Sequence, residues 1–197
     1  MLCGMTSLYA DECVDSCDVK PFQLALFNPL QLQTEDNSIS GLRIDLIFGV
    51  NQNLTGLDFG MVNLLNGNLT GLQVGLVNNV EDCVFGLQQG VLNLADTVMG
   101  VQEGFVNMTC TLYGWQNGIV NISKDEMVGV QSGIFNQSCK GEGLQLGIVN
   151  MSSQFEGLQL GLVNYTDDLI GLQLGLINID VNATATYAYL PIFRACW

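Results

Sequence analysis

The chain has 197 residues, 48% of them apolar, with 23 glycines, 19 acidic residues, five basic residues and no histidine. An apolar content near half supports a folded core and argues against intrinsic disorder. Without histidine the chain cannot build a Ser-His-Asp or Cys-His catalytic system or a histidine-ligated zinc site. The net charge of −14 argues against nucleic acid or anionic lipid as a partner, because phosphate binding depends on clustered basic residues.

Residues 1–19 are expected to form a leader and linker. The stretch Met1–Ala10 is small and apolar, and Leu8-Tyr9-Ala10 before Asp11 resembles the end of a signal peptide without its basic start. The alternative is a plain disordered leader. No stretch reaches the roughly 18 continuous apolar residues that a membrane-spanning helix requires.

Residues 20–40 are predicted to form an N-terminal cap. Phe22–Phe27 alternates like a β-strand, Asn28-Pro29 marks a turn, and Leu30–Gln33 returns along the first strand. A cap is needed here because an exposed strand edge would template association with other chains.

Residues 41–184 consist of a repeat of 14 or 15 residues. The pattern is nearly fixed: Gly, apolar, Gln, variable, Gly, apolar, apolar, Asn, which we number as positions 1 to 8, followed by a polar stretch. The glycines at position 1 are Gly41, Gly56, Gly71, Gly86, Gly100, Gly114, Gly129, Gly143, Gly157 and Gly171. Nineteen of the 23 glycines fall at positions 1 and 5, and this regularity predicts a repeat architecture.

Two glycines within five residues disfavour a helix, and the many Leu, Val and Ile residues favour strands. The sequence predicts an all-β fold: a short-coil parallel β-solenoid or β-roll of about ten repeats with capping strands. The alternative is an antiparallel β-meander or barrel. Poor alternation at position 4 speaks against that alternative. The one-residue length difference falls in the polar stretch, predicted to be a turn, because a slip within paired strands would reverse their faces.

In a solenoid, identical side chains of successive repeats stack and can form ladders of amide hydrogen bonds. The predicted glutamine ladder is Gln73, Gln88, Gln102, Gln116, Gln131, Gln145, Gln159 and Gln173. The predicted asparagine ladder is Asn63, Asn78, Asn93, Asn107, Asn121, Asn136, Asn150, Asn164 and Asn178. The pattern leaves open which face of each strand points inward and the handedness of the coil. Residues 185–197 are predicted to form a C-terminal cap strand.

The residue pattern of several segments resembles that of a known group of proteins. The segments are Pro21–Phe27, Gly41–Ile44 with Phe48–Asn51, the Gly-Leu-Gln-x-Gly-Leu-Val-Asn lines, and Leu190-Pro191-Ile192. Together they resemble the bacterial surface-repeat proteins first described in spirochaetes, over about residues 20–195. The resemblance implies an exported cell-envelope protein and supplies no functional residues. The coil length is also similar to that of the β-roll in the heads of trimeric autotransporter adhesins.

The seven cysteines suggest little chemistry. They are Cys3, Cys13, Cys17, Cys83, Cys110, Cys139 and Cys196. Cys13 and Cys17 have the spacing of a small disulfide loop or a metal pair, but no second pair follows at zinc spacing. Cys83, Cys110 and Cys139 lie two repeats apart, too far for disulfides with one another, and are predicted to be small core or turn residues. The pairing of Cys13, Cys17 and Cys196 stays open.

The sequence predicts a noncatalytic cell-envelope or surface protein that acts as a structural scaffold or binding rod. The alternative is an outer-membrane β-barrel protein. No constellation of catalytic residues is visible, so we expect no enzyme, cofactor or metal site, and the acidic pairs such as Asp167-Asp168 are interpreted as solvated surface. Self-association, another envelope protein and a glycan stay open as partners. Position 4 is polar in repeats four to seven and Leu in the last three, which indicates either a contact patch or a tolerant surface position.

Overall fold

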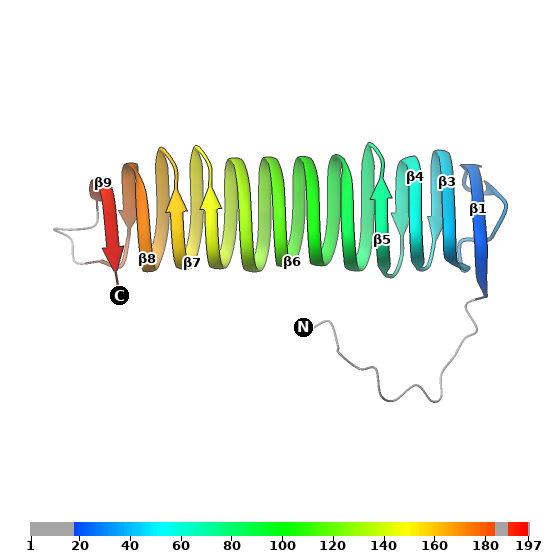
Figure 1. Ribbon diagram of the computed structural model, residues 1–197, viewed down its shortest axis with the longest axis horizontal. Helices are drawn as coiled ribbons and strands as arrows, with labels where there is room; N and C mark the ends of the chain where they lie inside the picture. Colours follow the sequence, from blue (N-terminus) through cyan, green and yellow to red (C-terminus); the bar gives the residue numbers. More distant parts are fainter. Residues whose placement is uncertain (1–17, 184–188, 197) are drawn as a thin grey trace, which may run out of the picture.

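The computed structural model describes residues 18–183 and 189–196. These residues form a rod of β-coils stacked along its long axis (Figure 1). Among them there is no helix, and so none that could cross a bilayer. The predicted leader, except Asp18 and Val19, lies outside the described residues, as do Cys3, Cys13 and Cys17.

The described residues form nine hydrogen-bonded strands. They are β1 (Val19–Phe27), β2 (Leu30–Gln31), β3 (Ser38–Asn51), β4 (Leu54–Leu65), β5 (Leu69–Val74), β6 (Val77–Leu146), β7 (Val149–Leu160), β8 (Val163–Asp180) and β9 (Tyr189–Cys196). Strand β6 is 70 residues long because the chain stays extended through several complete coils. The polar stretches predicted to be turns are therefore largely strand, and they form a third side of each coil.

Successive coils pair in parallel, like residue on like residue. Gly56 pairs with Gly71 between β4 and β5, and Gln145 pairs with Gln159 between β6 and β7. The same register continues through β8, where Gln159 pairs with Gln173. The predicted parallel β-solenoid is confirmed. The antiparallel meander or barrel is wrong, because antiparallel pairing occurs only at the two ends of the described sheet.

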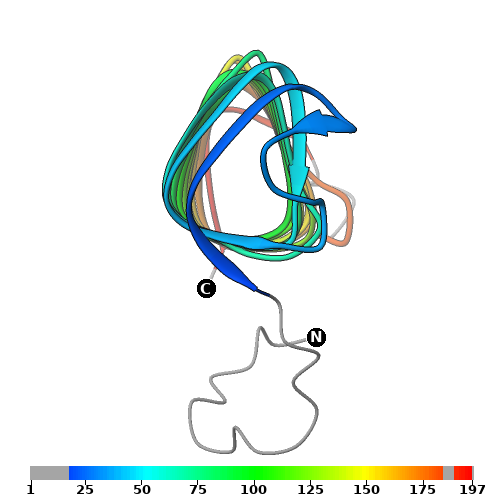
Figure 2. The same cartoon turned by 90° about the vertical axis from the view of Figure 1, so that its right-hand side faces the viewer.

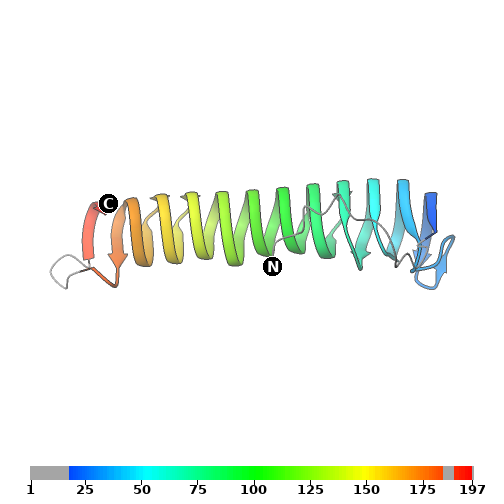
Figure 3. The ribbon, with the colours of Figure 1, turned by 90° about the horizontal axis from the view of Figure 1, so that it is seen from below.

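The coil has a rounded triangular outline when viewed along the rod (Figure 2). Bends at Gly75-Leu76 and at Asn66-Gly67, with the turn at the position 1 glycines, divide each coil into three parts. We name these side A (positions 1 to 5), side B (positions 6 to 10) and side C (the remaining residues before the next glycine). Straight sides separated by corners let every coil stack directly on the one before it (Figure 3).

The two ends of the rod are closed by different strand arrangements. At the N-terminal end, β1 extends the parallel stack by pairing with β3, and the short β2 folds back antiparallel on β1. At the C-terminal end, β9 runs antiparallel to β8. Both arrangements replace a bare coil edge with a strand of different geometry, which limits further pairing along the stack.

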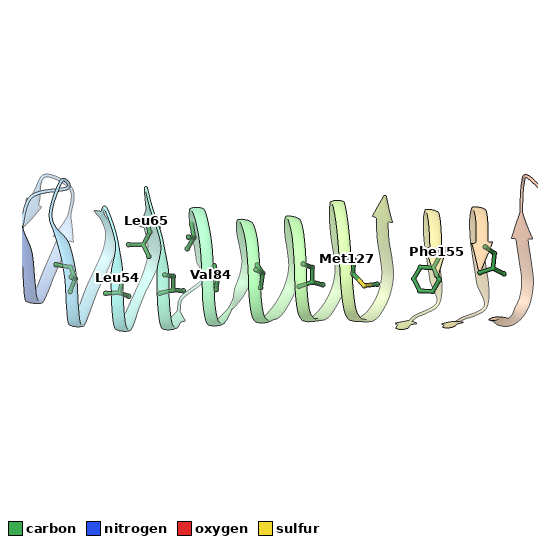
Figure 4. Packing of buried hydrophobic residues seen from close by; sticks show 11 residues of the cluster. Leu54, Leu65, Val84, Met127 and Phe155 are labelled. Atoms are coloured by element: carbon green, nitrogen blue, oxygen red, sulfur yellow. The ribbon is translucent and has the colours of Figure 1, made fainter. Parts of the chain in front are cut away.

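The interior is more polar than the core of most proteins. All glutamines of the predicted ladder and all its asparagines are fully buried. A row of apolar side chains from side C, with Leu65 and Val80 from side B, completes the core (Figure 4). That row is Ile39, Leu54, Leu69, Val84, Val98, Leu112, Met127, Phe155 and Leu169. The structure thus settles the inward face that the sequence left open: positions 3 and 8 point inward.

One coil breaks the apolar row. Gly141 stands where neighbouring coils carry a large side chain, and it pairs in register with Phe155. The Phe155 ring fills the gap, since its Cδ2 lies 2.5 Å from the point where Gly141 would carry a Cβ. A glycine and a phenylalanine in adjacent coils therefore conserve core volume together.

Candidate functional site

The glutamines form a continuous hydrogen-bonded ladder inside side A. Each one donates its Nε2 to the Oε1 of the glutamine one coil nearer the N-terminus, at 2.7 to 2.9 Å from Gln173 to Gln73. All the donors therefore point towards the N-terminal end. Aligned amide bonds of this kind polarise and strengthen one another.

The asparagines form a second ladder with the opposite direction. Each donates its Nδ2 to the Oδ1 of the asparagine one coil nearer the C-terminus, at 2.8 to 2.9 Å from Asn63 to Asn178. The second Nδ2 hydrogen donates to the position 4 carbonyl of that next coil, at 2.8 to 3.0 Å. The amide dipoles of the asparagine ladder are opposite in direction to those of the glutamine ladder. The dipoles of the two ladders therefore do not add up along the rod.

The close packing of the coils requires glycine at positions 1 and 5. The ten position 1 glycines have φ between +122° and +152°, a backbone region that side chains disfavour. A Cβ at most of them would also collide with the carbonyl oxygen of the glycine in the preceding coil, as at Gly114. At position 5, from Gly75 to Gly175, a Cβ would lie 2.5 to 2.7 Å from an asparagine Nδ2 of the preceding coil. The second glycine therefore makes room for the asparagine ladder.

The glutamine ladder ends in a buried ion pair at the N-terminal end. Gln73 donates its Nε2 to Asp58 Oδ2 at 2.9 Å, and Arg43 donates Nε and Nη2 to the two Asp58 oxygens at 2.8 Å each. Arg43 Nη1 also donates to the Leu64 carbonyl oxygen at 3.0 Å. Arg43 and Asp58 occupy position 3 of the first two repeats and are fully buried. The Asp58 carboxylate, which Arg43 binds in a bidentate pair, thus accepts the hydrogen bond from the last donor of the neutral glutamine ladder.

Asp45 stands at the head of the asparagine ladder. Gly49 pairs in register with Asn63, and the Asp45 carboxyl group fills the space that a Gly49 side chain would need. Asp45 Oδ2 lies 3.1 Å from Arg43 Nε, yet within the described chain neither Asp45 oxygen nor Asn63 Oδ1 accepts a hydrogen bond. Burial raises the pKa of Asp45 to about 7, Arg43 lowers it and Asp58 raises it.

A second buried ion pair lies at the C-terminal end. Arg194 of β9 pairs in register with Gln173, so it continues the same column of side chains. Its Nη2 donates to Asp180 Oδ2 at 2.7 Å and its Nε donates to the same oxygen at 3.1 Å. Two of the chain's five basic residues therefore lie inside the rod, one at each end.

The outside of the rod is apolar along the corner between sides A and B. Position 6 carries a large apolar residue in each repeat from the second to the tenth, 44% to 67% exposed. These residues are Met61, Leu76, Val91, Phe105, Ile119, Ile134, Ile148, Leu162 and Leu176. The outward residues of side A at positions 2 and 4 include one charged residue, Glu103. Exposed apolar surfaces of this length are typical of interaction sites.

Charge is concentrated on side C. In the repeats from the third to the ninth this side carries nine acidic residues and two lysines. They are Glu81, Asp82, Asp96, Asp125, Glu126, Glu142, Glu156, Asp167, Asp168, Lys124 and Lys140. Over these repeats the rod is therefore amphipathic, with polar amides inside, apolar residues on two outer sides and acidic residues on the third.

Side C also contains a hollow of about 620 Å³ near the C-terminal end, lined by Phe155, Met127 and Leu169 with Lys140 and Glu142 among its polar residues. Within the described ranges, no group of three or more cysteine or acidic residues is placed to hold a metal ion. The lining of the hollow also includes Glu126, Glu156, Asp168, Asp180 and Cys196.

The cysteines differ in their bonding. Cys83 is buried, as expected for a small core residue, but it is also disulfide-bonded, which the sequence did not indicate. The signal for this bond is absent from the repeats, because Cys83 has no partner at a suitable repeat offset. Cys110 and Cys196 are free and half-buried, and Cys139 is free and exposed.

Sequence reasoning missed the charged residues that close the ladders. Arg43 and Asp58 replace glutamine at position 3 in adjacent repeats, and Asp45 replaces glycine at position 5. Opposite charges at equivalent positions of neighbouring repeats were the signal that could have revealed them.

Comparisons with protein-family models, with curated proteins and with solved structures found no match to this chain.

Proposed function

We propose that the protein is a noncatalytic scaffold or binding rod of a bacterial cell envelope, exported from the cytoplasm. The observation that carries the proposal is the exposed apolar surface of sides A and B, which extends over nine successive repeats. Solenoids commonly use such extended faces to bind other macromolecules. The envelope location rests on the resemblance to bacterial surface-repeat proteins.

The interior supports a mechanical role. Each coil is joined to the next by a backbone ladder and by two side-chain amide ladders. Stacked coils of this kind contact only their neighbours, so stability and stiffness accumulate along the rod. The result is a long surface of fixed spacing, which suits a scaffold.

Side A supplies the contact patch. The outward residues at positions 2 and 4 of the last three repeats are all leucine, among them Leu158, Leu160, Leu172 and Leu174. In repeats four to seven, position 4 is Gln, Glu, Asn or Ser. The leucine patch is therefore chemically distinct from the middle of the same side.

Cell fractionation tests this function. We expect the full chain in the envelope fraction of the source cells, and recovery in the cytosolic fraction would overturn the location. We expect the double variant Leu160→Asp, Leu174→Asp to leave the envelope fraction at least about 10-fold more readily than wild type, because a charge in an apolar contact is desolvated. The matched control is Ser153→Asp, Gln154→Asp on side C, which adds the same charge. Equal retention of the two variants would overturn the binding role of side A.

A further inference from the structure

We propose that side B is an interface between two copies of this chain, so that the working form of the rod is a side-by-side dimer. This inference rests on the proposed function in one respect, namely that the rod binds through its apolar surface. It goes further by naming the face and the partner.

Side B is the most uniform outer surface of the molecule. From the second repeat to the tenth, positions 6 to 9 contain no charged residue. Position 7 alternates with the buried position 8, is half-buried in all of these repeats except at the exposed Ile177, and is aliphatic or aromatic in every one of them. The position 7 residues are Val62, Val77, Leu92, Val106, Val120, Phe135, Val149, Val163 and Ile177. At position 9 the outward residues are also mostly apolar, with Asn79, Gln137 and Tyr165 as the polar exceptions.

The area of side B matches a stable interface. Nine coils about 4.8 Å apart and five residues of about 3.3 Å each give a face of roughly 700 Å². A standard protein interface buries about 800 Å² on each partner. The largest apolar patch on a typical monomer is about 300 to 600 Å², so side B exceeds what a protein normally leaves uncovered.

The regular spacing of side B favours a second copy over an unrelated protein. Its side chains form ridges that repeat once per coil, and the register of β7 with β8 keeps Val149 directly over Val163. A partner can fill the grooves between these ridges along the whole face only if its own ridges have the same spacing. Another copy of this solenoid meets that condition by construction.

The distribution of charge agrees with this pairing. The acidic residues lie on side C, so two rods that meet through side B do not bring acidic surfaces together. A lipid surface fits less well, because amphipathic elements that lie on membranes carry Lys and Arg on their polar face, whereas side C carries nine acidic residues and two lysines.

Pairing through one face also fixes the size of the assembly. A two-fold arrangement uses side B of each copy once and leaves none exposed, so it closes at a dimer. Side A, with its leucine patch, stays available for the envelope contact.

Sedimentation equilibrium of the full chain, with free thiols alkylated, tests the proposal. We expect the wild type to be a dimer. The double variant Val120→Lys, Phe135→Lys places two charges on side B, and we expect its dimerisation to be at least about 100-fold weaker because buried unpaired charges are costly. The matched control Asn117→Lys, Ser132→Lys adds the same charges to side A in the same two coils and should remain dimeric.

A second variant covers a possible loss of folding. Ile119 and Ile134 are 44% and 50% exposed, so Ile119→Ser, Ile134→Ser removes apolar contact area without disturbing the interior, and it should also weaken the dimer. A monomeric wild type, or equal dimerisation of all four proteins, would overturn the proposal. Wild-type monomers that bind phosphatidylcholine vesicles through side B would also overturn it, in favour of lipid. A monomer retained in the envelope would refute only the dimer, whereas a cytosolic dimer would refute only the proposed function.

Discussion

The regular middle of the rod and its N-terminal head solve the same problem with different chemistry. In the middle, every ladder amide is satisfied by a neutral neighbour one coil away, as Gln116 is by Gln102. At the head the column continues with Asp58, Arg43 and, in β1, Gln23, and Asp58 with Arg43 receives the last donor of the ladder. A repeat can satisfy its own polar groups indefinitely, but its first member needs a partner that the repeat does not contain.

The C-terminal end shows that the direction of a ladder matters as well. There the glutamine ladder presents an acceptor, Gln173 Oε1, which accepts no hydrogen bond within the described chain. At the head the same ladder presents a donor, and a carboxylate accepts it. The two buried ion pairs, Arg43 with Asp58 and Arg194 with Asp180, therefore lie in unlike surroundings, although Arg43, Asp58 and Arg194 occupy the same column.

The largest effect is expected from breaking the head pair. In Arg43→Gln, the Asp58 carboxylate stays buried without its bidentate partner, and Asp45 loses its only nearby positive charge. Removing one member of a buried pair costs about 3 to 5 kcal/mol. We expect the free energy of unfolding, measured by urea denaturation, to fall by about 4 kcal/mol.

The compensating variant sharpens this comparison. In Arg43→Gln, Asp58→Gln the head carries the same residue as the middle, and the neutral ladder extends by two rungs. We expect most of the lost stability to return, because replacing both members of a buried pair is often close to neutral. If the double variant is as unstable as Arg43→Gln alone, the head is more than a terminus for the ladder.

The next effect is the pH dependence caused by Asp45. Burial raises its pKa from 3.8 to about 7, against the lowering effect of Arg43 and with the raising effect of Asp58. The folded state therefore keeps a proton that the unfolded chain releases near pH 4. The resulting stability is fully present below that pH and is lost as the pH rises towards 7. Relative to Asp45→Asn, we expect wild-type stability to fall by about 2.5 kcal/mol between pH 5 and pH 8.

The asparagine variant is the natural control for this measurement. An amide at residue 45 cannot ionise, and it offers a donor beside Asn63 Oδ1, the unpaired acceptor at the head of the asparagine ladder. Urea denaturation at several pH values should therefore give converging stabilities at low pH and a more stable variant above pH 7. Parallel curves for the two proteins would contradict the assignment of the titration to Asp45.

The regular middle could be predicted from the sequence, and the head could not. The period, the parallel stacking and the residues of both ladders follow from positions 1, 3, 5 and 8. When identical repeats stack in register, equivalent residues of successive coils become neighbours. The sequence did not predict which face of the strands points inward. An amide that is hydrogen-bonded to the equivalent amide of the next coil is as stable inside as a leucine, so polarity no longer indicates exposure. Arg43, Asp45 and Asp58 were missed because each departs from the repeat, and a pattern says least about its exceptions.

The smallest effect is expected from interrupting the glutamine ladder in the middle. Gln116→Leu keeps a side chain of similar volume but leaves Gln102 Oε1 without its donor and Gln131 Nε2 without its ladder acceptor. Two imperfectly satisfied buried amides cost about 2 kcal/mol, half the effect at the head, since Gln131 Nε2 also donates to Ser123 Oγ at 3.2 Å and to the Gln137 carbonyl oxygen at 3.1 Å. The matched control is Asn117→Leu, an outward substitution in the same coil, which should change the free energy of unfolding by less than about 0.5 kcal/mol. A loss in Gln116→Leu as large as that in Arg43→Gln would mean that neutral and charged rungs are equally critical, and the distinction between middle and head would fail.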